Sequence, residues 1–230
     1  MANILTNLLE LFFPKLCVLC KEPLTQGEEQ ICLDCLCDLP LTHYDVLSDN
    51  PVIQLFADKE YIENATSLFH YEKGGKTQTL VHAFKYHGNK ELAYQLGRQM
   101  ALTLQSHPAY RHADAIIPIP LHKKRKRKRG YNQAEWIAKG VASVWAIPVL
   151  PDILARTTTS DSQTRKNFYD RWLNVKEVFA LKDTHTLAGK HILLIDDVIT
   201  SGSTLSACAE TLAQIPDLRI SILTLAATYH

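Results

Sequence analysis

The sequence predicts an α/β protein in which a parallel sheet flanked by helices follows a small, cysteine-rich N-terminal module. The first observation is that short apolar segments alternate with helical ones along residues 66–227, which is the pattern of a parallel sheet covered by helices. The second is that four of the six cysteines lie within residues 17–35. A chain of 230 residues is long enough for one medium domain and a small appendage.

Composition places the chain among ordinary globular proteins. Its hydrophobic fraction of 46% is ordinary. Because its net charge is only +1, no overall electrostatic field favours one class of partner. No apolar segment approaches the ~20 residues that a membrane span needs, and we expect no span. The N-terminus is apolar but lacks a basic start and carries Glu10, which disfavours a signal peptide. We therefore expect a cytoplasmic protein, and a reducing compartment disfavours disulfides.

The chain is expected to divide into two units. An amphipathic helix that Pro14 ends is predicted at the N-terminus, with these residues on one face: Ile4, Leu5, Leu8, Leu9 and Phe12. The cysteine-bearing segment has no long hydrophobic run and cannot build a core of its own, so it needs a cross-link such as a disulfide or a bound metal ion. Residues 40–60 are polar and irregular and are expected to be a linker. The predicted units are therefore residues 1–55 and residues 56–230.

The second unit contains the predicted sheet. Strands are expected over residues 66–71, 113–120, 191–195 and 220–227, with a further short one over 147–150. Helices are expected where apolar residues recur at helical spacing, over residues 79–84, 91–104, 134–145 and 203–215. The polar residues 155–175 are expected to form a long loop. In such sheets, ligands bind beyond the carboxyl ends of the strands.

Two acids follow the most apolar of these strands. The strand "HILLI" leads into Asp196 and Asp197, and small polar residues come next: Thr200, Ser201, Gly202, Ser203 and Thr204. Backbone N–H groups and hydroxyls at the start of the following helix form an anion site, and glycine allows close approach. Carboxylates instead accept hydrogen bonds from sugar hydroxyls, or hold Mg²⁺ through its waters. The expected ligand therefore carries a phosphate and a diol on one small body, as a ribose 5-phosphate does; the alternative is an ordinary capped turn.

The string "ILLIDDVITSGST" resembles the phosphoribosyl-pyrophosphate (PRPP) binding motif of type I phosphoribosyltransferases. The resemblance implies the type I phosphoribosyltransferase fold. It also implies that Asp196 and Asp197 hold the ribose hydroxyls while residues 200–204 hold the 5-phosphate. The acceptor base cannot be read from the sequence.

A basic run marks a second candidate region. Residues 123–129 read "KKRKRKR" and are followed by Gly130, Asn132 and Gln133. Seven consecutive cations repel one another unless an anion, such as pyrophosphate or a nucleic-acid backbone, relieves the repulsion. The alternatives are a solvated loop or a nuclear-localisation signal, although the run lies between structural elements. We expect Lys128, Arg129, Asn132 and Gln133 to form the anion-binding loop.

The string "PIPLH", basic run, "RGYNQA" is similar to the ComF family, which includes ComFC-like competence proteins and GntX-like proteins. The stretch "FKYHGNKELAYQLG", the N-terminal cysteines and residues 156–179 carry the same resemblance. The family-matching positions in the last of these are Arg156, Gln163, Arg171, Asn174 and Phe179. Lys166 departs from the family's usual leucine. The resemblance spans nearly the whole chain and implies a link to DNA uptake during natural competence.

The cysteine spacing C-x2-C-x11-C-x2-C predicts a structural Zn²⁺ site. Its ligands would be Cys17, Cys20, Cys32 and Cys35, because four thiolates close the tetrahedral shell of zinc. A treble-clef or a ribbon-like shape is open, and so is a set of reduced, unliganded thiols. Cys37 could compete as a ligand, whereas Cys208 is expected to pack in the core.

Two functions of different classes follow. The first is a phosphoribosyltransferase that displaces pyrophosphate from PRPP-Mg²⁺, with Asp196, Asp197 and Arg129 as catalytic residues and residues 155–175 as a lid. The second is a competence protein that binds single-stranded DNA through the zinc module and the basic run, helped by Tyr131. Expected partners are therefore PRPP or a related phosphoribosyl ligand, single-stranded DNA and other competence proteins.

Overall fold

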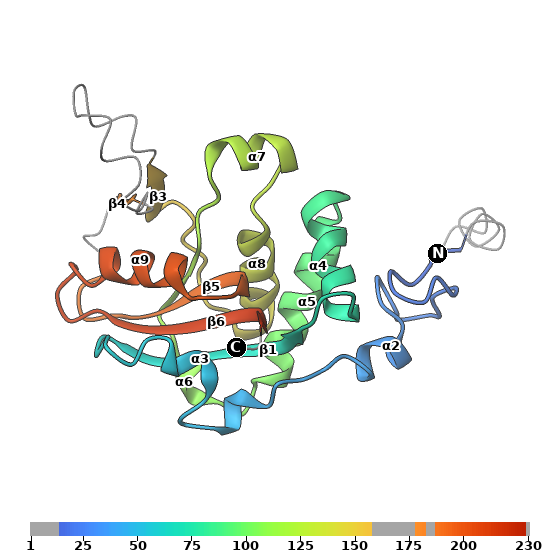
Figure 1. Cartoon of the computed structure of the whole chain (residues 1–230), viewed down its shortest axis with the longest axis horizontal. Helices are drawn as coiled ribbons and strands as arrows, with labels where there is room; N and C mark the ends of the chain where they lie inside the picture. Colours follow the sequence, from blue (N-terminus) through green and yellow to red (C-terminus); the bar gives the residue numbers. More distant parts are fainter. Residues whose placement is uncertain (1–13, 158–177, 183–186, 229–230) are drawn as a thin grey trace.

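The computed structural model describes residues 14–157, 178–182 and 187–228, and it confirms the α/β class. A four-stranded parallel sheet has the order β1-β6-β5-β2 (Figure 1). Its strands are β1 (Ile62–Tyr71), β2 (Ala115–Pro118), β5 (His191–Ile199) and β6 (Arg219–Thr228). The two central strands, β5 and β6, are almost continuously apolar because helices cover both of their faces.

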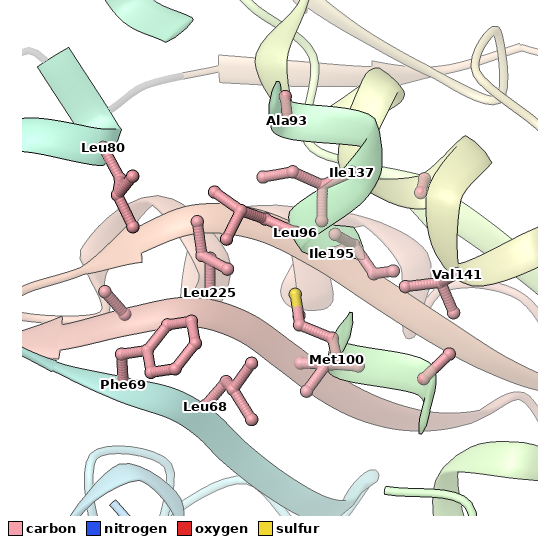
Figure 2. Close-up of a cluster of buried hydrophobic side chains, with 14 of the residues drawn as sticks. Leu68, Phe69, Leu80, Ala93, Leu96, Met100, Ile137, Val141, Ile195 and Leu225 are labelled. Carbon is pink, nitrogen blue, oxygen red and sulfur yellow. The ribbon is translucent and has the colours of Figure 1, made fainter. Parts of the chain in front are cut away.

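Helices on the two faces bury two separate apolar clusters. On one face lie α4 (Lys76–Tyr86), α5 (Lys90–Thr103) and α8 (Gln133–Trp145). Figure 2 shows part of that cluster, in which Leu96, Met100, Ile137 and Val141 meet Ile195 and Leu225 of the sheet. The opposite face packs against α9 (Ser203–Leu212). Neighbouring residues of β5 point to opposite faces, so Leu193 joins the first cluster and Leu194 the second.

The helices α5 and α8 cross in direct backbone contact. A Cβ atom added to Gly97 would lie 2.1 Å from the Ile137 carbonyl oxygen, and one added to Gly140 would lie 2.1 Å from the Tyr94 carbonyl oxygen. Only glycine permits this approach, because any side chain would overlap the facing backbone. The crossing fixes α8, whose first turn carries Gln133 into the candidate site.

The prediction of an irregular linker over residues 40–60 is wrong. This stretch contains a 3₁₀ helix, η1 (Tyr44–Val46), and α3 (Pro51–Gln54). Asn50 bonds to both helices. Its Oδ1 accepts the N–H groups of Val52 and Ile53 at the start of α3, and its Nδ2 donates to the Tyr44 carbonyl of η1 at 3.2 Å. The same Nδ2 donates to the Ala65 carbonyl of β1 at 2.9 Å. The polar composition that suggested a linker thus includes a buried helix cap. A domain boundary near residue 55 remains a prediction.

The basic run is also not a loop, because it forms the helix α7 (Lys123–Arg129). The His122 ring nitrogen Nδ1 accepts the Lys124 N–H at its start, and Gly130 ends it with a left-handed φ of 81°. The short helix α6 (Pro108–Arg111) precedes β2. The expected strand over 147–150 contributes only a bridge between Val149 and Ile116 among the described pairings.

A small antiparallel pair lies outside the main sheet. It joins β3 (Leu154–Thr157) to β4 (Val178–Leu181), so the expected loop over 155–175 begins with strand residues. The rest of that loop lies outside the described residues, and so do the N-terminal helix predicted over residues 4–12 and the family-matching Gln163, Arg171 and Asn174.

In the N-terminal module, α2 (Leu33–Cys37) follows the third cysteine of the motif. Among the described residues, no helix is long and apolar enough to cross a membrane.

Candidate functional site

The two acids lie within β5 rather than beyond it, because the strand continues to Ile199. Their side chains point to opposite faces of the sheet. Asp197 is 9% exposed, and its Oδ1 lies 2.8 Å from Nζ of Lys85, a residue of the last turn of α4. Asp196 accepts the Asp197 backbone N–H at 2.8 Å. Asp197 is thus neutralised by a lysine, whereas Asp196 is held by the backbone N–H of the next residue.

The environment of Asp196 favours its protonated form. Burial, and then the neighbouring charge of Asp197, raise the pKa of Asp196 to about 7, against the lowering effect of the Asp197 N–H, Lys85 and Arg156. A buried carboxylate with a strongly raised pKa in a cleft is typical of functional sites.

This shift predicts the effect of Asp196→Asn. The folded protein holds a proton that the unfolded chain releases near pH 4, so stability falls as the pH rises from about 4 to about 7. The amide should remove that penalty and raise the free energy of unfolding on the order of 2 kcal/mol at pH 8, with little gain at pH 4. Urea unfolding at the two pH values measures it. The control Asp114→Asn should not raise the free energy of unfolding. The His191 N–H lowers the pKa of Asp114, so the charged carboxylate already stabilises the folded protein.

The hydroxyl-rich turn lies beside the acids, where the sequence predicts an anion site. Gly202 has a left-handed φ of 72° and starts α9, and a Cβ atom there would lie 3.3 Å from the Phe56 ring. A small hollow of about 50 Å³ is lined by Asp196 and by residues 198–200 and 202–205. The Ser201 and Ser203 hydroxyls are 3.2 Å apart. The turn therefore combines hydroxyls, a helix start and glycine within one concave surface.

A cavity of about 200 Å³ adjoins this hollow and shares Asp196 and Thr204 with it. Its other polar lining residues are Lys85, Arg125, Arg129, Asn132, Gln133, Arg156 and Asp197. Four cations and two carboxylates thus face one space. The site can hold an anion and a hydroxyl-bearing or cationic group side by side.

The predicted anion loop is only partly in this cavity. Arg129 donates from Nη1 to Gln133 Oε1 at 2.9 Å, and the Asn132 amide donates to the Ile119 carbonyl at 2.9 Å. Both amides are buried and hold the ends of α7 and α8 in place. Lys128 instead lines an adjacent hollow of about 600 Å³, together with Tyr86.

The four predicted metal ligands come together. The Sγ atoms of Cys17, Cys20, Cys32 and Cys35 all lie within 4.8 Å of one another. The Cys32 N–H donates to Cys17 Sγ at 3.4 Å. Burial opposes ionisation of Cys17, but backbone N–H groups, led by that of Cys32, lower its pKa to about 6. Four converging thiols, of which Cys17 accepts backbone N–H groups, fit a structural metal ion.

The other two cysteines lie elsewhere. Cys37 is exposed and outside the four-cysteine cluster of the described residues. Cys208 lies on the buried face of α9 and packs in the core, as the sequence predicts. Neither Cys37 nor Cys208 is therefore placed to act as a ligand of a metal ion bound by the four-cysteine cluster.

Comparisons with known proteins agree with this layout. Residues 133–228 match the family model described as a phosphoribosyl transferase domain. Competence protein ComFC of Bacillus subtilis is 27% identical over 201 residues, covering 87% of this chain and 78% of the relative. Competence protein F of Haemophilus influenzae is 35% identical over 103 residues, covering 44% and 45%. The domain match, these relatives and the four-cysteine cluster together fit a ComF-family protein with a phosphoribosyltransferase fold.

Another relative is the DNA utilization protein YhgH of Escherichia coli K12, which is 26% identical over 214 residues, covering 86% of this chain and 91% of the relative. Among solved structures, a purine phosphoribosyltransferase from Pyrococcus horikoshii has a TM-score of 0.37 and 16% identity, covering 57% of this chain and 73% of its own. A hypothetical protein from Neisseria gonorrhoeae with bound ppGpp has a TM-score of 0.39 and 17% identity, covering 61% and 69%. TM-scores and sequence identities this low do not allow the ligand of either structure to be inferred for this chain.

Sequence reasoning missed two cations that line this cavity, Lys85 and Arg125. Lys85 lies in a string that carries the family resemblance, but nothing local to it indicates a carboxylate partner. Arg156 was placed among family-matching positions, and the structure adds that it lines the cavity with its guanidinium 5.8 Å from the Phe179 ring centre. Burial lowers the pKa of Arg156, which is the cost of placing a cation in a partly closed site.

Proposed function

We propose that the protein binds PRPP, or a related ribose 5-phosphate ligand, together with Mg²⁺ and acts as a phosphoribosyltransferase. One observation carries the proposal: two carboxylates at the end of a central parallel strand adjoin both a hydroxyl-lined hollow and a cation-lined cavity. A phosphate, a diol and a pyrophosphate on one ligand would use all three features. The phosphoribosyl transferase domain match is consistent with this ligand class.

Each group then has a role. Asp196 and Asp197 hold the ribose hydroxyls, the turn over residues 200–204 holds the 5-phosphate, and Arg129 faces the pyrophosphate. Since the nucleophile is the acceptor, the protein contributes position and charge stabilisation of the leaving group rather than a covalent step. Asp197 already holds one cation, the ammonium of Lys85, so its surroundings suit a cation. Mg²⁺ would add charge neutralisation at the pyrophosphate.

Calorimetric titration with PRPP and Mg²⁺ tests the proposal. The wild type should bind with a micromolar dissociation constant, and the Asp196→Asn/Asp197→Asn variant should lose about 100-fold or more in affinity. Asp197→Asn removes the partner of Lys85, so a melting curve of each protein verifies that a loss of binding does not reflect unfolding. A wild type that does not bind PRPP would contradict the proposed function.

A second candidate function is binding of single-stranded DNA in natural competence. It is supported by α7, an exposed helix of seven basic residues, and by the exposed Tyr86 ring, which lies 5.4 Å from the Arg129 guanidinium carbon. Relatives named for competence or DNA utilization point to the same process. In this proposal the zinc module and other competence proteins take part, in the cytoplasm.

The two functions separate experimentally. Binding of an oligothymidylate should weaken steeply as salt rises, because phosphates release counterions. It should survive Asp196→Asn/Asp197→Asn, which abolishes PRPP binding. If the acid substitutions instead removed DNA binding and left PRPP binding intact, the assigned roles would be reversed.

A further inference from the structure

Lys85 lines two hollows that share several cations, and only one of the two contains carboxylates. It lines the cavity that contains both acids and also the larger hollow formed by Tyr86, Arg125, Lys128 and Arg129. The side chains of Lys85 and Asp197 are only 17% and 12% exposed. Solvent screens this ion pair far less than a surface pair of equal length.

The ion pair competes with the proposed ligand. A ribose hydroxyl or a hydrated Mg²⁺ can use Asp197 fully only after the ammonium of Lys85 has left it. The released ammonium would remain in largely closed surroundings without a counter-charge, and an unpaired cation in such surroundings is costly. An anion in the same space would compensate that charge.

The second hollow offers such a place. No carboxylate is among the residues that line it, and three other cations contribute to its wall. Lysine has a flexible four-carbon stem that carries a point charge, so its ammonium can move several ångströms without movement of the helix. Arg129 cannot move so freely, because Gln133 holds its guanidinium.

We propose that Lys85 is a counter-ion switch that pairs with Asp197 in the ligand-free protein and with the ligand's pyrophosphate when a cation or hydroxyl takes Asp197. This inference rests on the proposed function and names a positioning residue for it. Because one ammonium cannot serve both partners, occupation of the acid and binding of the anion become coupled. The switch would disfavour either half of the ligand when it binds alone.

The experiment measures the two halves separately. Mn²⁺ alone and inorganic pyrophosphate alone are titrated against the wild type, Lys85→Met, Asp197→Asn and the double variant. Lys85→Met should bind Mn²⁺ about tenfold more tightly and pyrophosphate about tenfold more weakly. Asp197→Asn should bind pyrophosphate more tightly than the wild type, and most of that gain should vanish in the double variant.

Opposite shifts for cation and anion distinguish a switch from a structural ion pair, whose loss would weaken both. Lys139→Met is the matched control, since Lys139 also lies 2.8 Å from a carboxylate, that of Glu135, but on the exposed face of α8. If Lys85→Met fails to fold, Asp197→Asn and the double variant, which leave no unpaired acid, still decide the result. A pyrophosphate gain that persists without Lys85 would overturn the switch, whereas a wild type without PRPP affinity would overturn the proposed function instead.

Discussion

Gly140→Ala should destabilise the protein by about 3 kcal/mol or more, although alanine is the better helix former by about 1 kcal/mol. The added Cβ atom would lie 2.1 Å from the Tyr94 carbonyl oxygen, which belongs to the backbone of α5 and cannot rotate away. The two helices would have to separate along their whole length. Separation would loosen the buried contacts among Leu96, Ile137 and Val141 that Figure 2 shows.

Chemical unfolding of Gly140→Ala and of a matched variant measures this effect. Gly75→Ala serves as the match, because its Cβ atom would come no nearer than 3.3 Å to Glu72 and Gly75 does not have a left-handed φ. It should change stability by less than about 1 kcal/mol. Equal unfolding midpoints for Gly140→Ala and the wild type would show that α5 and α8 do not depend on this approach.

The strands and helices of the sheet domain could be predicted because their patterns are local. The run His191–Ile195 has the continuous apolar character of a central parallel strand, and α8 repeats its apolar residues at helical spacing. The apolar pattern stops at Ile195, but the strand continues through both acids, since backbone pairing with β6 extends to Ile199. Pairing partners, rather than composition, set where this strand ends.

The errors arise where single residues decide local structure, either beside the segment or through a bond to a distant strand. Repulsion among seven cations favours a loop over residues 123–129, but a histidine cap and a terminal glycine bound a helix there. The polar stretch around Asn50 has the composition of a linker, yet its side chain bonds to β1. In both cases one well-placed side chain outweighs the average tendency of its neighbours.

The candidate site shows the same division. The positions of Asp196, Asp197 and the hydroxyl-rich turn could be expected, because parallel strands bring their carboxyl ends to one edge. The pairing of Lys85 with Asp197 could not, because it depends on how far α4 extends and which of its faces meets the sheet. Lys128 is expected from the sequence in the anion-binding loop but lines the second hollow instead of the cavity with the acids. Its position within the basic run does not indicate which of the two hollows it lines.

Removal of the proposed zinc ion should unfold residues 15–37 before the sheet. This segment has few apolar residues of its own, and its buried members, such as Cys17 and Ile31, lie in the same cluster as Leu80. We expect a chelator to lower the melting temperature on the order of 10 °C and to abolish amide-exchange protection in this segment first. Hydrogen exchange read by mass spectrometry, with metal analysis of the untreated protein, measures both.

Cys20→Ser and Cys37→Ser form a matched pair for this test, because both thiols are exposed but only Cys20 belongs to the cluster. Cys20→Ser should reproduce the chelator's effect, whereas Cys37→Ser should retain one equivalent of zinc and the wild-type exchange pattern. Unchanged exchange in residues 15–37 after chelation would leave four reduced thiols in place of a metal centre. The stability of this segment would then come from the packing of residues such as Ile31 against the sheet domain, and not from a metal ion.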